Sequence, residues 1–174
     1  MFKQGEHIAL RAIEPSDLDY LFDAENDEAI WEVSNTVAPY SRYVLKHYLD
    51  NAHRDIYEVK QLRLAVLLKG MGTVIGFVDL FDFEPKHRRA GLGIVIFDTA
   101  QRGKGHAAEA IKLMAAYARE HLNMHQLYAN IVGDNTLSTR LFERCGFVRA
   151  GEKKDWIFSN GGFKNELLYQ LVLG

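Results

Sequence analysis

Two hydrophobic patterns follow one another along the chain. In short runs, hydrophobic and polar positions alternate; in longer runs, hydrophobic residues recur every three to four positions. The first pattern predicts strands and the second predicts helices. Pro15 in an acidic turn indicates the start of one helix, and Ser41 and Asn135 are placed to cap two others. We therefore expect strands over 7–13, 61–69, 73–83, 91–97, 126–132, 147–158 and 163–173, and helices from Pro15, after Ser41, over 107–122 and over 135–145.

Glycine-containing turns separate several of these elements. Gly70-Met71-Gly72 predicts a hairpin between the strands at 61–69 and 73–83, and Ser159-Asn160-Gly161-Gly162 predicts another between the last two strands. Gly146 fits the left-handed position that follows a helix, which makes Phe142 and Phe147 the two side chains that touch in a Schellman motif. That packing alone accounts for an aromatic residue at Phe142.

The strand at 73–83 carries a carboxylate in an aromatic row. Strict alternation would place five side chains on one face of this strand: Ile75, Phe77, Asp79, Phe81 and Phe83. Burial there would raise the pKa of Asp79 unless a cation or hydrogen-bond donors lie beside it, and a raised pKa suits a general base near neutral pH. The structural alternative is that Asp79 pairs with an arginine or bonds a neighbouring loop.

A glycine-rich loop, Arg102-Gly103-Lys104-Gly105-His106-Ala107, follows the strand at 91–97 and opens the helix at 107–122. Such a loop directs unpaired backbone N–H groups and the positive end of the helix dipole at one point, which favours phosphate. A Walker A site is excluded, because Asp98 stands where that motif requires glycine. The relaxed dinucleotide fingerprint is matched, but there the glycines follow the strand directly, whereas here five residues, 98–102, intervene.

Composition indicates one domain spanning 1–174, with 48% hydrophobic and 25% charged residues. No apolar run approaches the ~20 residues of a membrane span, and the first six residues do not resemble a signal peptide. The formal charge of −2 gives no electrostatic footprint for nucleic acid. Cys145 is the one cysteine, which fits a reducing compartment, so we expect a cytoplasmic location without membrane or nucleic-acid partners. Whether the chain forms a homo-oligomer is left open.

Three further clusters contain residues that can bind ions. The acidic stretch 25–32 is interpreted as a solvated helix face, with a cation-binding wall as the alternative. The basic stretch 86–89 is interpreted as a solvated hairpin tip, with contact to an anionic ligand as the alternative. His121 and His125 have the spacing of helical metal ligands, but Asn123 interrupts the helix and no third ligand is in view, so we expect no metal.

The glycine-rich loop together with the segment from Asn135 to Cys145-Gly146-Phe147 resembles the GNAT family of N-acetyltransferases, and the likeness in element order runs from His7 to Leu173. Within that family the chain is similar to the branch of spermidine and diamine N-acetyltransferases and ribosomal-protein N-terminal acetyltransferases. The resemblance implies an α/β (α+β) fold. Its mixed sheet of six to seven strands would be splayed at the acetyl-CoA site and flanked by about four helices.

The resemblance also implies a site and a reaction. Acetyl-CoA would be the co-substrate, and a primary amine would attack its thioester directly. The acceptor is left open between a polyamine-like small amine and a peptide or protein N-terminus. Expected cofactor-binding residues are Val95, Ile96, Phe97, Arg102, Gly103, Lys104, Gly105, His106, Ala107 and Asn135.

The expected catalytic residues are Ser138 and Asp79. Polyamine members carry a tyrosine acid where Phe142 stands, and Ser138 matches the serine that the N-terminal acetyltransferases place one turn earlier. The carboxylate that family members carry after the basic turn is absent from 90–93, so the base is Asp79, a carboxylate of 25–32, or water. Two rival functions remain: a degenerate relative that binds CoA without fast turnover, and a dinucleotide-binding oxidoreductase.

Overall fold

The computed structural model describes residues 2–174 and places all of their strands in one mixed sheet. Within this range the strands are β1 (Lys3–Gln4), β2 (Ile8–Ala12), β3 (Leu62–Leu68), β4 (Val74–Glu84), β5 (Arg89–Ile96), β6 (Gln126–Val132), β7 (Val148–Ser159) and β8 (Gly162–Val172). The helices are α1 (Leu18–Glu25), α2 (Glu28–Ser34), α3 (Arg42–Asp50), α4 (Ile56–Val59), α5 (His106–Glu120) and α6 (Thr136–Arg144), with 3₁₀ turns η1 (Pro15–Asp17) and η2 (Thr99–Gln101).

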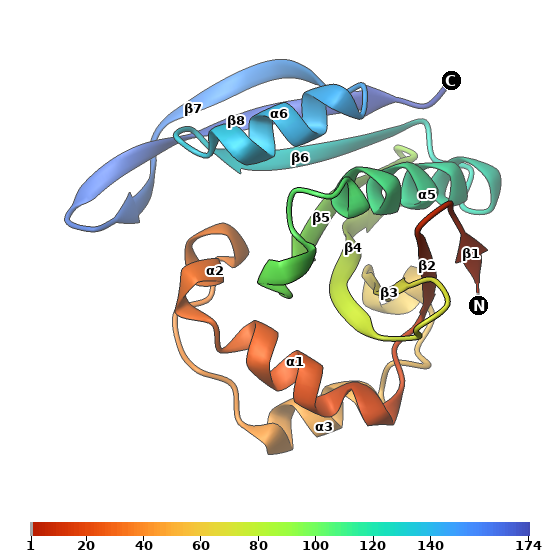
Figure 1. Cartoon of the computed structure of the whole chain (residues 1–174). Coiled ribbons are helices and arrows are strands. Elements are labelled where there is room, and N and C mark those ends of the chain that lie inside the picture. The colour runs from red at the N-terminus through yellow and green to blue at the C-terminus, as the bar shows by residue number, and fades with distance from the viewer. Residues whose placement is uncertain (1) are drawn as a thin grey trace.

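The sheet has the order β1-β2-β3-β4-β5-β6-β8-β7 and divides at its middle. Figure 1 shows an N-terminal part, β1 to β5, flanked by α1 and α3, and a C-terminal part, β6 to β8, flanked by α6. Neighbouring strands are antiparallel except β5 and β6, which are parallel and joined through α5. A parallel pair requires such a crossover helix.

Helices cover both faces of the sheet and form two hydrophobic clusters. On one face α5 buries Ile111 and Met114 against Leu80 and Leu127. On the other face α1 and α3 pack against β3 and β4 around Phe77. The sheet therefore has no face that is left bare over its N-terminal part. None of the helices in residues 2–174 is long and apolar enough to cross a membrane.

The splay expected from the family resemblance is confirmed by the pairing between β5 and β6. These strands pair at only three positions, from Arg89 with Gln126 to Gly91 with Tyr128. From Leu92 to Ile96, β5 remains paired with β4 on its other side but has no strand partner toward β6. The separation leaves room for a ligand between the two parts of the sheet.

Local turn predictions were also confirmed. Asn160 and Gly161 form a two-residue hairpin turn with φ of 51° and 80°, which both require the left-handed region. Gly146 has φ of 91°, and the amide of Phe147 donates to the carbonyl of Phe142 at 3.1 Å. The rings of Phe142 and Phe147 meet edge to face at 5.0 Å, which completes the Schellman motif.

The fold class was predicted correctly, but some elements were missed. Residues 2–174 form eight strands and six α-helices, against the six to seven strands and about four helices expected. The additions are β1, with two residues, α4, with four, and α2, an acidic segment whose Ile30 is its one buried residue. Elements this short carry too little periodicity to be recognised from sequence.

The alternation expected along β4 is wrong at two of its five positions. A bulge beside Ile75 shifts the pairing with β3, and a second bulge between Phe81 and Glu84 shifts the pairing with β5. Ile75 and Phe83 consequently lie in the hydrophobic cluster under α5, on the other side from Phe77. A bulge adds one residue and so reverses the faces of the side chains that follow it.

Candidate active site

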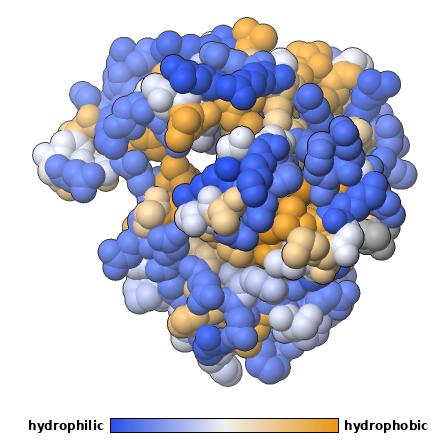
Figure 2. Space-filling view, in the orientation of Figure 1, coloured by the Kyte–Doolittle hydropathy of each residue, from blue (hydrophilic) through white to orange (hydrophobic). Residues whose placement is uncertain are grey.

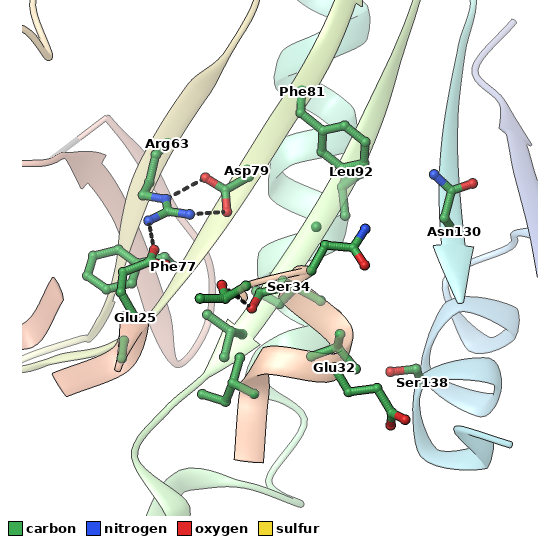
Figure 3. Close-up of a pocket in the computed structure, with 18 of the residues that line it drawn as sticks. Glu25, Glu32, Ser34, Arg63, Phe77, Asp79, Phe81, Leu92, Asn130 and Ser138 are labelled. Atoms are coloured by element: carbon green, nitrogen blue, oxygen red, sulfur yellow. Dashed lines mark hydrogen bonds and ion pairs between the residues drawn. The ribbon is translucent and has the colours of Figure 1, made fainter. Parts of the chain in front are cut away.

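A cleft of about 730 Å³ lies where the two parts of the sheet separate. Its walls come from β4, β5 and β6, from α1 to α3 on the N-terminal side, and from α6 on the other. Figure 2 shows the surface hollowed between these two sides, with hydrophobic residues exposed along the hollow. Figure 3 shows polar side chains from both sides pointing into the space. The cleft thus continues from the free edge of β5 to the acidic segment that forms α2.

The glycine-rich loop lies at the N-terminus of α5, beside the free edge of β5. Gly103 and Gly105 have φ of 74° and 85°, a region that other residues adopt with strain. Gly105 is the N-cap of α5 and provides no side-chain hydrogen bond, whereas α2, α3, α4 and α6 each have a capping side chain. The first amides of α5 are therefore left for another acceptor, as an anion site requires.

Two residues of this loop direct their side chains elsewhere. Arg102 folds back, and its Nε donates to the carbonyl of Ile96 at 2.8 Å. His106 is a buried residue, 7% exposed, and its ring centroid lies 6.3 Å from that of His7. The five residues between strand and loop are largely taken up by η2, whose start is capped by Asp98. The side chain of Arg102 is thus engaged with β5, and that of His106 is buried.

The expected residues at the end of β5 do not all face the cleft. Val95 lines it, whereas Ile96 belongs to the cluster under α5. Phe97 packs on the opposite face, with its ring 5.6 Å from Phe77 and 5.9 Å from Tyr20. Neither Ile96 nor Phe97 lines the cleft.

Asn135 and Ser138 face the cleft from the first turn of α6. The Asn135 side-chain oxygen accepts from the amide of Ser138 at 3.1 Å, which is the predicted N-cap. Thr139, rather than Ser138, bonds back to the carbonyl of Asn135. Figure 3 shows the Ser138 hydroxyl directed into the cleft. Phe142 lines the same wall one turn later and has no proton to donate.

Asp79 is held by an arginine that the sequence had not identified. Arg63 donates from Nε to one carboxylate oxygen at 2.7 Å and from Nη2 to the other at 3.1 Å, while its Nη1 donates to Glu25 (Figure 3). Burial alone would lower the pKa of Arg63, but the adjacent charge of Asp79, helped by Glu25, outweighs it and raises that pKa. This is the ion-pair alternative stated for Asp79, and it fixes α1 to β3 and β4.

A second bridge crosses the mouth of the cleft. Lys164 of β8 donates to Glu32 of α2 at 2.7 Å and lies 2.8 Å from Asp134, next to α6. Hydrogen bonds from Lys164 and then Ser159 lower the pKa of Glu32. Part of the acidic stretch 25–32 is thus neither freely solvated nor free to bind a cation. Sequence gave no signal for this bridge, whose two ends lie 132 positions apart.

The basic turn has a structural role that the sequence interpretation missed. Arg88, with φ of 51°, donates to the backbone carbonyl and the side chain of Asn123 at 2.7 and 2.8 Å. The turn between β4 and β5 is therefore tied to the segment between α5 and β6, away from the cleft. Arg88 is not a merely solvated hairpin tip.

Comparison with known proteins gives one family for most of the chain. Residues 7–148 match the model described as the acetyltransferase (GNAT) domain. The spermidine N(1)-acetyltransferase of Vibrio cholerae serotype O1 is 29% identical over 166 residues, which cover 92% of this chain and 90% of that protein. The SPbeta prophage-derived uncharacterized N-acetyltransferase YokL of Bacillus subtilis is 25% identical over 168 residues, covering 97% and 91% of the two chains.

Solved structures agree with this match. The crystal structure of spermidine N-acetyltransferase from Vibrio cholerae in complex with CoA and spermine superimposes with a TM-score of 0.85 at 27% identity. The alignment covers 97% of each chain. The likeness therefore includes both parts of the sheet and both sides of the cleft.

Proposed function

We infer, from the premise that this chain belongs to the GNAT family of acetyltransferases, that acetyl-CoA lies in the splay between β5 and β6 and that the acceptor amine enters through the adjoining cleft. The chain is an N-acetyltransferase, an acyltransferase that uses acetyl-CoA to acetylate an amine. The observation that carries the location of the site is the unpaired edge of β5 beside the uncapped N-terminus of α5.

The residues at this place fit a ligand that joins an anionic group to a chain of amides. Backbone amides from Gly103 to Ala107 would hold the pyrophosphate, with Lys104 adding charge at the exposed loop. Backbone groups from Val95 to Phe97 would pair with the pantetheine chain as a further strand does. Asn135 has its side-chain oxygen engaged in the cap, which leaves its amide nitrogen for the cofactor.

Acetyl-CoA supplies an activated thioester. The reaction then needs an acceptor for the proton of the attacking amine and a donor that protonates the departing thiolate. The Ser138 hydroxyl, directed into the cleft from α6, would give a proton to the departing thiolate. Asp79 remains a candidate base, but both of its oxygens accept from Arg63, and Glu32 is held by Lys164. We therefore favour water as the acceptor of the amine proton, with Asp79 and Glu25 positioning Arg63.

The acceptor we propose is a small primary amine that carries further amino groups, as the names of the spermidine-acetylating relatives suggest. A peptide or protein N-terminus is the second candidate, favoured by Ser138 and Phe142 in place of an acidic tyrosine. We also propose that residues 1–174 act as one acetyltransferase domain and that the enzyme works in the cytoplasm, where its lone Cys145 would stay reduced.

The test is to incubate the purified chain with acetyl-CoA and a panel of amines and N-terminal peptides. Free thiol release gives the rate, and mass spectrometry identifies the acetylated product. We expect release with at least one small amine. Tight CoA binding without release for any acceptor would instead support a CoA-binding module, and binding of NAD(P) in place of CoA would support the oxidoreductase.

A further inference from the structure

Five carboxylates line the cleft, and four of them already hold a cation of the chain itself. The five are Glu25, Glu32, Asp79, Asp82 and Glu166. Arg63 binds Glu25 and Asp79, Lys164 binds Glu32, and Lys153 lies 3.0 Å from Glu166. Among residues 2–174, Asp82 is the one cleft carboxylate that no lysine, arginine or histidine contacts, and its partner is the Tyr128 hydroxyl at 3.4 Å.

The backbone of β4 is bulged at Asp82, where the strand reaches the cleft. The bulge lies between Phe81 and Glu84, with φ of 46° at Asp82, and both Phe81 and Asp82 line the cleft, whereas Phe83 lies in the core. Left-handed backbone at a residue other than glycine is uncommon and clusters at functional sites.

Phe81 supplies an apolar surface between Asp82 and the centre of the cleft. A Cβ atom on Gly91 would stand 2.2 Å from Cε2 of Phe81, and one on Gly93 would stand 3.8 Å from its Cε1. The ring therefore lies over glycines that leave it room, with Tyr128 edge-on at 6.0 Å. Figure 3 shows the ring beside Leu92 on the cleft wall. Methylene groups pack on such a surface, and its face attracts an ammonium.

We propose that Asp82 binds the non-reacting ammonium of a short aliphatic diamine, whose methylene chain lies along Phe81 while its other nitrogen faces Ser138. This inference rests on the proposed function and narrows its acceptor. Ser138, Phe81 and Asp82 all line this one cleft. A third amino group finds no unpaired carboxylate along the cleft, so a triamine gains nothing over a diamine.

The test compares three acceptors of increasing charge: hexylamine, cadaverine and spermidine, at one fixed ionic strength. We expect kcat/KM for cadaverine to exceed that for hexylamine about fivefold, the effect of one partly exposed ion pair. Asp82→Asn keeps a residue that tolerates left-handed backbone but removes the charge. It should abolish the advantage of cadaverine over hexylamine, mainly by raising the KM for cadaverine.

Asp155→Asn is the matched control, because Asp155 also has a positive φ, of 48°, and does not line the cleft. It should alter none of the three rates. Equal rates for hexylamine and cadaverine, a clear preference for spermidine, or an unchanged cadaverine preference in Asp82→Asn would each overturn the role of Asp82 and leave the acetyltransferase standing. CoA binding without thiol release for any of the amines would overturn both the role of Asp82 and the acetyltransferase activity.

Discussion

Arg63 donates two parallel hydrogen bonds to Asp79, from Nε to Oδ1 at 2.7 Å and from Nη2 to Oδ2 at 3.1 Å. Both side chains are mostly buried, with 17% and 15% of their surfaces exposed. Arg63 also donates to Glu25, so this pair joins β3 and β4 to α1. It also places a fixed cation in the wall of the cleft.

We expect Asp79→Asn to destabilise the protein without changing the pH dependence of kcat. Removing one partner of a buried charge-assisted pair costs about 1–3 kcal/mol, which urea unfolding measures. Glu58→Gln, in the exposed pair with Arg54, serves as the control and should change stability little. Loss of the acidic limb of the pH–rate profile in Asp79→Asn would instead identify Asp79 as the base.

Ser138→Ala should lower kcat with little change in the affinity for acetyl-CoA. A general acid acts only in the transition state and contributes on the order of 10²-fold or more in rate. Thr139→Ala, which removes a neighbouring hydroxyl bonded to the Asn135 carbonyl, controls for disturbance of α6. Equal rates for wild type and Ser138→Ala would return Ser138 to a structural role and leave water to protonate the thiolate.

Gly105→Ala should weaken acetyl-CoA binding specifically. Alanine at φ of 85° is strained by about 1–2 kcal/mol, so the loop would relax and move the amides at the start of α5. Gly70 has the same φ of 85° in the turn between β3 and β4, and a Cβ meets nothing within 4 Å at either glycine. Calorimetry with CoA should show lower affinity for Gly105→Ala alone. A comparable loss in Gly70→Ala would refute the local role.

Asp17 should make stability depend on pH in the acid range. Burial would raise the pKa of Asp17, but hydrogen bonds from Arg11 and from the Glu14 amide outweigh it and lower that pKa. A carboxylate with a lowered pKa stabilises the fold fully above its unfolded pKa of about 3.9. The stabilisation is then lost as the pH falls through the folded pKa.

Asp17→Asn should therefore lower the urea midpoint clearly at pH 7 and progressively less below about pH 4. Asp19→Asn is the control, because Asp19 is an exposed carboxylate of α1, paired with an exposed Arg42. It should lower the midpoint little at either pH. If the difference in urea midpoint between wild type and Asp17→Asn stays constant down to acid pH, the charge of the buried carboxylate does not contribute to stability. Its packing would then account for the effect.

The sequence by itself determined the features that depend on neighbours along the chain. The left-handed turn at Asn160 and Gly161, the Schellman motif that joins Phe142 to Phe147 and the Asn135 cap of α6 were all predictable. Each arises from the backbone preferences of a few consecutive residues, so no distant contact was needed to fix it. The glycine-rich loop gave the family, and with it the place of the splay.

Tertiary structure decided which residues line the cleft. Alternation placed Ile75, Asp79 and Phe83 on one face, but two bulges separated them, because strand pairing with β3 and β5 outweighs local periodicity. Asp79 could be a base or half of an ion pair until β3 brought Arg63 beside it. Lys164 binds Glu32 only because the fold places β8 beside α2. Charge pairing depends on distances in space, and these are set by the whole fold.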